Sequence, residues 1–372
     1  MTNFGLQLPD YPWETLAPYQ KQAKEHPDGV INLSIGTPVD PTPKLIQEAL
    51  ANHTDAHGYP TTHGMQELRE AISAWFARRR NVSNLDPQDI MPTIGSKEFI
   101  AWLPTLLGLK KNDVVIYPAE AYPTYDIGAQ IAGCKGFAAD SISDYPKNTK
   151  LIWLNSPGNP NGKVLTHEEI HEVVDWARKN DAIVASDECY AELGWNEWED
   201  KIIPCLLDPE IAGESHKNLL CVYSLSKQSN LAGYRTSFVA GDSELIANLI
   251  NTRKHAGMIV PTPIQYAIIT ALGDDKHVQR QKDIYRERRT ILKDALENSG
   301  FKIKDSDAGL YLWATKGEDC WDTLGDFAKL GIIAGPGVFY GTGKSEYVRI
   351  AITEQTDKIK QAAKRLTTYY TE

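Results

Sequence analysis

The chain has 372 residues, of which 42% are hydrophobic and 24% are charged, as in ordinary globular proteins large enough for two domains. A formal net charge of −10 argues against a nucleic-acid-binding protein, which needs a basic face, and no stretch is apolar for the length of a membrane span. Five cysteines, an odd number without a C-x-x-C pair, favour reduced thiols and a cytoplasmic protein.

The first ninety residues predict helices around one strand. We expect a helix, a strand and a second helix over residues 13–26, 30–35 and 44–52. A polar loop that contains Tyr59 then leads to an amphipathic helix. The apolar face of this helix carries Leu68, Ile72, Trp75 and Phe76.

From residue 90 onward, short apolar strands alternate with helices, which is the pattern of an α/β sheet. The expected strands cover residues 90–94, 113–117, 150–154, 182–186, 219–223 and 236–240. Polar residues follow several of these strands directly, and α/β sheets bind ligands at the carboxyl ends of their strands. We therefore expect Gly95–Lys97, Asn159, Asp187 and Lys227 to meet at one site.

Beyond residue 240 the pattern changes from alternating strands and helices to helices with antiparallel strands. Helices are predicted over 243–253, from 261 onward, and over 276–298, 321–330 and 356–368. Strands are predicted over 301–304, 310–314 and 347–352, the first two as an antiparallel pair. The change indicates a large domain over residues 31–275 and a small domain made of residues 1–30 and 276–372.

Ser224, Ser226, Lys227 and Arg235 lie in one short segment that follows the strand 219–223. Two hydroxyls and an arginine suit a dianionic phosphate, and they lie beside an amine that can react. A lysine near a fixed arginine and away from water loses its charge more easily, because desolvation and a like charge both disfavour the ammonium. A neutral lysine can form a Schiff base.

Three other features predict bound anions or cations. The turn Gly95–Lys97 opens a helix, and backbone N–H groups at a helix N-terminus bind anions, so this turn is expected to complete the phosphate site. Asp187 ends an apolar strand, where a carboxylate is costly unless it is paired. Arg349 lies inside another apolar strand and requires an anionic partner.

The segment 167–171 fits H-E-x-x-H, the zinc peptidase signature. Thr166 and Glu169 form a capping box, so the two histidines do lie on a helix. They fall in its first turn, however, outside the apolar face, and no third ligand is apparent. We predict no metal site.

Two further segments fit known catalytic or phosphate-binding motifs only in part. The glycine-rich segment 335–345 ends in Lys-Ser, but its glycines are out of register for a P-loop. Ser224 and Lys227 form S-x-x-K, the nucleophile motif of penicillin-binding proteins and β-lactamases. Those acyl hydrolases also need a K-T-G tripeptide, which this sequence lacks, so this remains a remote alternative.

Taken together, these segments resemble the pyridoxal-phosphate (PLP) enzymes of fold type I, the aspartate aminotransferase superfamily. The resemblance is carried by the segments GYPTTHG, PTIGSKE, NSPGNPNG and SLSKQSNLAGYR. It implies an α/β fold whose large domain has a mostly parallel seven-stranded sheet between helices, with a smaller α+β domain. It also implies PLP as the cofactor and amino acids and 2-oxo acids as substrates.

The resemblance assigns roles to residues of this chain. Lys227 is expected to bind the cofactor aldehyde and to move the substrate proton. Asp187 is expected to pair with the protonated pyridine nitrogen, and Asn159 and Tyr190 to hydrogen-bond the phenolate oxygen. The residues expected to hold the phosphate are Gly95, Ser96, Lys97, Ser224, Ser226 and Arg235.

The remaining roles concern the ring face, the substrate and a second subunit. Tyr122 matches the aromatic residue that stacks on the pyridine ring, and core packing is its alternative role. Tyr59 matches a tyrosine that reaches the phosphate of a neighbouring subunit, which implies a homodimer. Arg349 is expected to clamp the substrate α-carboxylate, and Gly36 to let substrate approach the backbone.

Within the superfamily, the chain most resembles the actinobacterial N-succinyldiaminopimelate aminotransferases, through segments 32–41 and 308–321 as well. The implied reaction belongs to lysine biosynthesis. It moves an amino group between glutamate/2-oxoglutarate and N-succinyl-LL-2,6-diaminopimelate/N-succinyl-2-amino-6-oxopimelate. The residues do not define a pocket for the succinyl group. Aspartate, alanine or unsuccinylated diaminopimelate as the other substrate, a C–S lyase and a binding protein of the same fold are alternatives.

Overall fold

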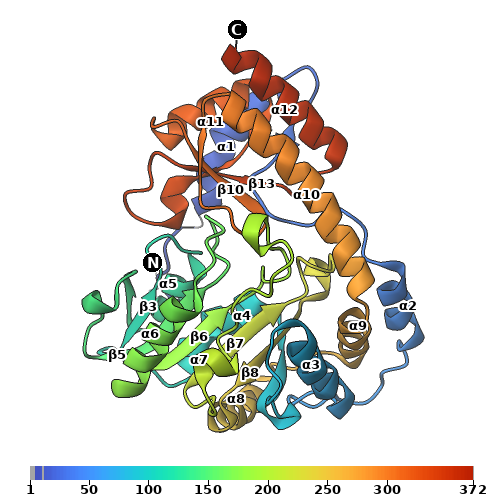
Figure 1. Ribbon diagram of the computed structural model, residues 1–372, viewed down its shortest axis with the longest axis vertical. Coiled ribbons are helices and arrows are strands. Elements are labelled where there is room, and N and C mark those ends of the chain that lie inside the picture. The colour runs from blue at the N-terminus through green and yellow to red at the C-terminus, as the bar shows by residue number, and fades with distance from the viewer. Residues whose placement is uncertain (1–4, 11, 372) are drawn as a thin grey trace.

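The computed structural model describes residues 5–10 and 12–371, with side chains up to residue 370. Residues 1–4 and Tyr11, which fall in the predicted small domain, and Glu372 lie outside the described residues. The molecule has two parts, with a seven-stranded sheet in the lower part of Figure 1 and a four-stranded sheet in the upper part.

The large sheet has the strand order β2-β8-β7-β6-β5-β3-β4. Its strands are β2 (Ile90–Ile94), β3 (Val114–Tyr117), β4 (Lys135–Ala138), β5 (Thr149–Asn155), β6 (Ile183–Asp187), β7 (Leu219–Ser224) and β8 (Thr236–Gly241). All pairings are parallel except those of β8, which is antiparallel to both neighbours. The predicted mostly parallel seven-stranded sheet is therefore confirmed.

Helices cover both faces of the large sheet, as its continuous apolar strands require. One face packs on α3 (Gln66–Arg79), α6 (His167–Lys179), α7 (Pro209–Ala212) and α9 (Thr262–Leu272), with α2 (Lys44–Asn52) beside α9. The opposite face packs on α4 (Ser96–Leu106), α5 (Thr124–Ala132) and α8 (Ser243–Ala256). Because helices cover both faces, a ligand can reach the sheet at its edges and at the ends of its strands.

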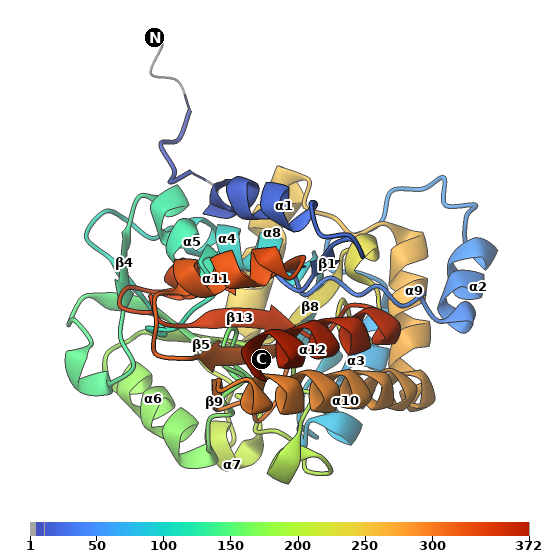
Figure 2. The same ribbon diagram turned by 90° about the horizontal axis from the view of Figure 1, so that it is seen from above.

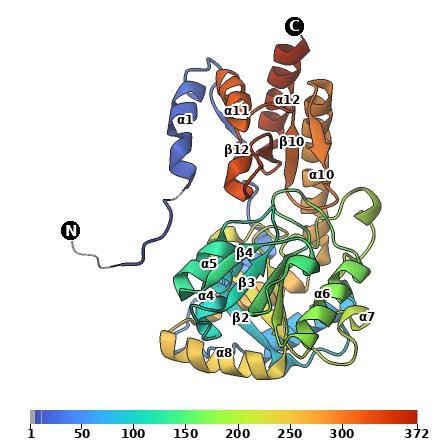
Figure 3. The same ribbon diagram turned by 90° about the vertical axis from the view of Figure 1, so that its left-hand side faces the viewer.

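The upper part is an antiparallel sheet packed with helices from both ends of the chain (Figure 3). Its strands, in the order β12-β13-β10-β9, are β9 (Lys302–Lys304), β10 (Tyr311–Thr315), β12 (Gly335–Pro336) and β13 (Val348–Ala351). Its helices are α1 (Ala17–Ala23), α10 (Asp275–Asn298), α11 (Cys320–Lys329) and α12 (Thr356–Thr371). A parallel pair, β1 (Ile31–Asn32) with β11 (Ile332–Ile333), joins the two ends of the chain. Figure 2 shows α1 beside α11 and α12 beside α10.

Several predicted elements differ from the structure. The strand expected over 30–35 is only two residues long, because only Ile31 and Asn32 find a partner in β11. The helix expected over 13–26 is a short 3-10 helix, Pro12–Leu16, followed by α1. The elements α5 and β4 were not predicted, although they complete the large sheet and one of its helical layers.

Two predicted helix starts are confirmed in detail. In α6, Thr166 accepts a hydrogen bond from the Glu169 N–H at 3.1 Å, and Glu169 accepts one from the Thr166 N–H at 2.9 Å. In α4, Gly95 is the N-cap residue with φ of 77° and ψ of 147°, a combination that glycine adopts and residues with a Cβ atom rarely do. Among the described residues, no helix combines the length and the apolar character that a membrane crossing needs.

Candidate active site

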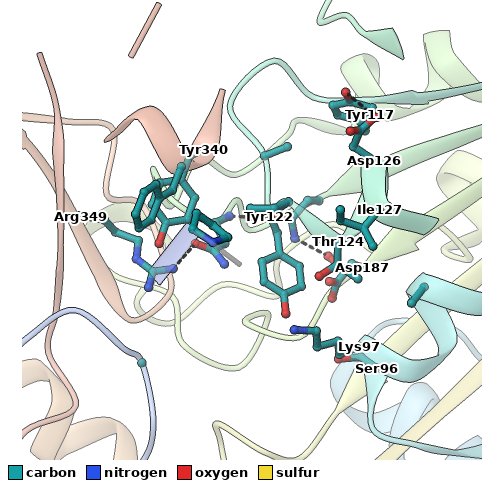
Figure 4. A pocket seen from close by; sticks show the side chains of 18 of the residues that line it. Ser96, Lys97, Tyr117, Tyr122, Thr124, Asp126, Ile127, Asp187, Tyr340 and Arg349 are labelled. Carbon is teal, nitrogen blue, oxygen red and sulfur yellow. Dashed lines mark hydrogen bonds between the residues drawn. The ribbon is translucent and has the colours of Figure 1, made fainter. Parts of the chain in front are cut away.

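A cavity of about 940 Å³ lies where the carboxyl ends of the parallel strands face the small sheet. Most predicted site residues line it, and Figure 4 shows several of them around Tyr122. The lining includes Gly36, Ser96, Lys97, Tyr122, Asn159, Asp187, Tyr190, Ser224, Ser226, Lys227, Arg235 and Arg349. The fold thus brings together residues that are more than three hundred positions apart in the sequence.

Lys227 projects into this cavity from the loop that follows β7. Its side-chain nitrogen donates a hydrogen bond to the carbonyl oxygen of Gly36. A Cβ atom on Gly36 would lie 2.2 Å from the hydroxyl oxygen of Tyr311, so a side chain at this position would displace Tyr311. The amine is therefore held at the cavity wall beside a backbone that has no side chain.

An anion-binding end forms where Arg235 meets the start of α4. A Cβ atom on Gly95 would lie 1.9 Å from a guanidinium nitrogen of Arg235, so the two are in direct contact. The hydroxyl of Ser226 accepts a hydrogen bond from the Ser224 hydroxyl at 2.8 Å, beside the same part of the cavity. The helix N-terminus, the guanidinium and the hydroxyls together suit a phosphate.

Asp187 is a buried acid at the end of β6. It accepts hydrogen bonds from the Tyr125 hydroxyl at 3.0 Å and from the Cys189 N–H at 3.2 Å. Burial raises the pKa of Asp187, although these hydrogen bonds oppose the rise. Among the described residues it has no cationic partner within 4.0 Å, so a cation in the cavity would stabilise its charged form.

Arg349 on β13 is buried with 4% of its surface exposed. Its guanidinium donates to the side-chain oxygen of Asn159 at 2.8 Å and to the carbonyl oxygen of Ser34 at 2.7 Å. Its Nε atom has no hydrogen-bond partner among the described residues. The carbon at the centre of the guanidinium lies 3.8 Å from the ring of Tyr311 and 4.7 Å from that of Tyr340. A buried guanidinium without a carboxylate is prepared to bind an anion.

Two tyrosines connect these groups. The hydroxyls of Tyr190 and Tyr311 are 3.5 Å apart. Burial and the neighbouring Tyr311 raise the pKa of Tyr190 well above its ordinary value. Burial also disfavours ionisation of Tyr311, but the charges of Arg349 and Lys227 outweigh it and lower the pKa of that hydroxyl. A negative charge in this pair is thus best carried by Tyr311.

Two predicted residues lie outside the cavity lining. Gly95 adjoins the cavity through Arg235, whereas Tyr59 is fully exposed in the loop between α2 and α3. Tyr59 therefore makes no contribution to the cavity of its own chain. Tyr122 lies inside the cavity, with the Lys97 side-chain nitrogen 5.9 Å from the centre of its ring (Figure 4).

Some site residues were missed. Tyr125 binds Asp187, and Asn155 fixes the following loop by accepting the Asn159 N–H at 2.8 Å. The aromatic residues Trp13 and Tyr311 contact Arg349 through their rings. Tyr125 and Asn155 could have been predicted, because they lie in the Tyr-Pro-Thr-Tyr and Asn-Ser-Pro-Gly-Asn segments that follow predicted strands. No sequence pattern indicates Trp13 or Tyr311.

The H-E-x-x-H segment and the glycine-rich segment lie in surroundings that differ from those of a zinc peptidase site and a P-loop. His167 and His171 are 40% and 50% exposed and face nearby carboxylates of Asp208, Glu210 and Asp175 at 3.9 to 4.0 Å. In the glycine-rich segment, Lys344 is bound to Glu120 at 2.9 Å, and the chain continues into β13 rather than into a helix. A P-loop requires a helix at that point.

Residues 28–366 match the family described as aminotransferase class I and II. The chain belongs to this aminotransferase family. The aminotransferase is 49% identical to the 4-dedimethylamino-4-oxo-anhydrotetracycline transaminase OxyQ of Streptomyces rimosus, over 97% of this chain and 99% of that protein. It is also 49% identical to a probable aminotransferase of Mycobacterium tuberculosis, over 98% of this chain and 86% of that protein.

Solved structures agree with this family. An aminotransferase from Neisseria meningitidis superposes with a TM-score of 0.88 at 32% identity, covering 98% of both chains. A probable N-succinyldiaminopimelate aminotransferase from Thermus thermophilus superposes with a TM-score of 0.86 at 26% identity, covering 96% of this chain and all of that chain. The expected aminotransferase fold is confirmed, and the substrate is left to be determined.

The cofactor of the aminotransferase is pyridoxal 5′-phosphate, and the cavity fits it. The close contact of Gly95 with Arg235 leaves a cradle that a side chain would fill, which suits a phosphate. The buried Asp187 suits a protonated ring nitrogen, because a cation beside it would offset the burial that raises its pKa and so stabilise its charged form. Lys227 and Arg349 line the same cavity as Asp187 and Arg235.

Proposed function

We propose that this aminotransferase moves an amino group between glutamate/2-oxoglutarate and N-succinyldiaminopimelate and its 2-oxo counterpart. The observation that carries the proposal is the buried Arg349, with an unpartnered Nε, on a cavity of about 940 Å³. An α-carboxylate bound at Arg349 leaves room for a long side chain. The similarity to the probable N-succinyldiaminopimelate aminotransferase of Thermus thermophilus and the segments 32–41 and 308–321 support the same substrate.

In the proposed mechanism, the bound PLP supplies an electron sink for the pair of electrons released when the substrate loses its α-proton. Lys227 would hold the cofactor aldehyde, and its amine, once the substrate amine has displaced it, would move this proton as a general base and acid. Arg349 binds the carboxylate in a fixed orientation, so that the Cα–H bond points toward Lys227. Asp187 keeps the ring nitrogen protonated through its charge.

The neighbouring residues position these groups. Asn159 and Tyr190 are proposed to hydrogen-bond the phenolate oxygen of the cofactor, and Tyr122 to stack on its ring. The residues proposed to hold the phosphate are Gly95, Ser96, Lys97, Ser224, Ser226 and Arg235. Gly36 leaves the backbone open at the point where substrate enters, and its carbonyl already accepts a hydrogen bond from Lys227.

We also propose a homodimer. Tyr59 is fully exposed and lies outside the cavity of its own chain, so a second copy of the chain must supply it if it binds cofactor. The five cysteines are all free, which supports a cytoplasmic location. We further propose that residues 31–275 form the large domain and that residues 1–30 and 276–372 together form the small domain.

One observation favours a second candidate, a bulky uncharged substrate. The cavity wall near Arg349 is formed by apolar and aromatic side chains, namely Trp13, Ile35, Val338 and Phe339. Among the described residues lining the cavity, the only lysines and arginines are Lys97, Lys227, Arg235 and Arg349. The distal carboxylates of N-succinyldiaminopimelate would need a partner subunit or water, whereas a ring system would pack on this wall directly.

The visible absorbance of the PLP-loaded enzyme distinguishes these candidates, since the band of the bound aldehyde disappears when the cofactor is converted to its amine. The proposal expects glutamate and N-succinyldiaminopimelate to remove the band and free diaminopimelate to act far less. Removal by glutamate and by a bulky aromatic amine, but not by N-succinyldiaminopimelate, would select the second candidate. The Lys227→Ala variant is the control and should convert neither substrate.

A further inference from the structure

Glu120 lies at the centre of a charged cluster that connects the two sheets. Its carboxylate accepts hydrogen bonds from the side-chain nitrogens of Lys304 at 2.6 Å, Lys344 at 2.9 Å and Asn161 at 2.9 Å. Only 7% of the Glu120 side chain is exposed. Burial would raise the pKa of Glu120, but the two lysines and the amide keep it below its ordinary value, so the carboxylate is charged at neutral pH.

The partners of Glu120 come from two different kinds of segment. Lys304 ends β9, and the backbone that follows it is held to the loop after β5, since the Ser306 N–H donates to the Asn161 carbonyl at 2.9 Å. Lys344 instead belongs to the glycine-rich segment, whose residues 337–344 we name the flap loop. A further hydrogen bond joins the flap loop to the segment that carries Glu120, from the Ala121 N–H to the Tyr340 carbonyl at 2.8 Å.

The flap loop forms one wall of the substrate cavity. Val338, Phe339, Tyr340, Gly341 and Thr342 all line that cavity. The ring of Tyr340 lies 4.7 Å from the guanidinium of Arg349, and Phe339 packs edge-on against Trp13 with ring centres 5.3 Å apart. The position of the flap loop therefore sets both the surroundings of Arg349 and the space for the substrate side chain.

A close backbone approach holds the flap loop against the loop of Glu120. A Cβ atom on Gly341 would lie 2.2 Å from the carbonyl oxygen of Ala119, and Gly341 has φ of 147°. Glycine thus lets the two loops touch, and the ion pair between Lys344 and Glu120 holds them there. The same loop carries Tyr122 two residues after Glu120, so the cluster also adjoins the proposed ring-stacking residue.

We propose that Glu120 and Lys344 are positioning residues that pin the flap loop over the substrate cavity, acting through Tyr340 and Phe339 on substrate binding. Lys304 and Asn161 orient the carboxylate from the fixed side. The proposal rests on the aminotransferase activity of the family and not on which second substrate the enzyme uses.

The proposal predicts an asymmetry between two lysines that bind the same carboxylate. Lys344→Met releases the flap loop, whereas Lys304→Met leaves it attached through Lys344. The apparent affinity for a substrate falls with the fraction of molecules in the binding-competent arrangement. A loop pinned in only about one molecule in ten would raise KM for glutamate about tenfold while kcat at saturation changes less than about twofold.

The variants Lys344→Met, Lys304→Met and Glu120→Gln are compared in the PLP-loaded enzyme with glutamate as the donor. Lys293→Met is the matched control, because Lys293 makes an equally short pair with Glu297 at 2.7 Å within α10, away from the cavity. The proposal expects KM to rise in Lys344→Met and Glu120→Gln and to stay near the wild-type value in the other two. Equal effects of Lys344→Met and Lys304→Met, or no effect of Lys344→Met, would overturn it.

Limited digestion with chymotrypsin gives a readout that does not depend on activity. Phe339 and Tyr340 are cleavage sites for this protease, and release of the flap loop exposes them. Faster cleavage is expected in Lys344→Met than in Lys304→Met or Lys293→Met, and equal rates in all three would contradict the proposal. If glutamate fails to convert the wild-type cofactor while digestion shows the asymmetry, the proposed function fails and the flap proposal stands. Should Glu120→Gln fail to fold, Lys344→Met carries the test alone.

Discussion

Arg349 shows how one side chain is prepared for its ligand by its neighbours. Asn159 and the Ser34 carbonyl fix two of its nitrogens, and the rings of Tyr311 and Tyr340 cover its faces. A lysine at this position would keep the charge but lose the planar, bidentate geometry and the stacking.

We therefore expect Arg349→Lys to lower kcat/KM for amino acids about a hundredfold, which corresponds to about 2.7 kcal/mol of transition-state stabilisation. Steady-state kinetics with glutamate measures this loss. The absorbance of the bound cofactor should be unchanged, because the proposed ligand of Arg349 is the substrate and not the cofactor. A variant with wild-type kcat/KM would show that the carboxylate binds elsewhere.

His277 provides a pH-dependent contribution to stability. It is buried on α10, with its ring nitrogens 3.1 Å from Asp274 and 2.8 Å from the hydroxyl of Ser229, two residues after Lys227. Burial lowers the pKa of His277, although Asp274 opposes the shift. The unfolded chain binds a proton here near pH 6.5, whereas the folded protein binds it only at a lower pH.

Stability should therefore be fully present above about pH 6.5 and decrease as the pH falls through the lowered pKa of His277. Urea unfolding at several pH values measures this slope. His277→Gln should flatten it, and the slope that remains should come in part from His63 and His216, whose pKa values burial also lowers. An unchanged slope in His277→Gln would exclude this histidine as a contributor.

At the residue scale, the sequence predicted the groups that bear chemistry better than the groups that position them. Lys227, Asp187 and Arg349, which line the cavity, were predicted because a reactive amine, a buried carboxylate and a buried guanidinium need partners. Tyr311 was not found, since its contact with Arg349 depends on the register that places Trp313 opposite Arg349 between β10 and β13. No local pattern encodes that register.

Gly95 shows how the start of one helix shapes the anion-binding end. Its φ of 77° strains any other residue, and a Cβ atom would collide with Arg235 at 1.9 Å. Gly108 also has a positive φ, of 71°, with nothing within 4 Å of a Cβ atom, so Gly108→Ala is a control for a positive φ without a collision.

Gly95→Ala and Gly108→Ala should each lose about 1 to 3 kcal/mol of stability from the backbone strain. Only Gly95→Ala should also weaken PLP binding, by about tenfold or more, because it displaces Arg235, and each 1.4 kcal/mol of lost binding is a tenfold change. Cofactor titration by fluorescence, together with thermal unfolding, separates the two effects. Equal PLP affinity in both variants would argue against the phosphate site at Gly95.

At the element scale, local signals predicted what local interactions determine. The bounds of α2 and β2 and the capping box of α6 were predicted because caps, prolines and apolar periodicity specify them. The elements α5 and β4 were missed, since the segment 124–138 is rich in glycine and alanine and lacks a clear period. Tertiary packing against α4 and β3 decides the structure of that segment.

The proposed homodimer gives a prediction for the whole molecule. If Tyr59 of one subunit completes the site of the other, Tyr59→Ala and Lys227→Ala variants should each have little activity. After mixing and subunit exchange, hybrid dimers contain one site with both native residues, and about a quarter of wild-type activity should return in an equal mixture with a two-fold interface.

Activity assays of the mixture, beside assays of each variant alone, measure this recovery. A mixture that stays as inactive as its components would place Tyr59 outside the shared site. A light-scattering mass of a single chain would contradict the dimer directly.

The α/β class and the layer order of the whole molecule follow from the alternation of strands and helices. The substrate does not, because the cavity wall joins Trp13, Ile35 and Phe339 from three distant segments. Their side chains become neighbours only when β1 pairs with β11 and the flap loop is in place. The shape of the pocket is therefore a property of the assembled chain.

The contacts that close the cavity have a consequence for how the enzyme gains activity during folding. Arg349 reaches Ser34 across 315 residues and Asn159 across 190, and Lys227 reaches Gly36 across 191. Contacts between residues so far apart in the sequence form late, because the chain must lose the entropy of closing a long loop before the contact stabilises it. On dilution from urea, helical circular dichroism should therefore recover first, and the ability to convert glutamate should follow as a separate, slower phase.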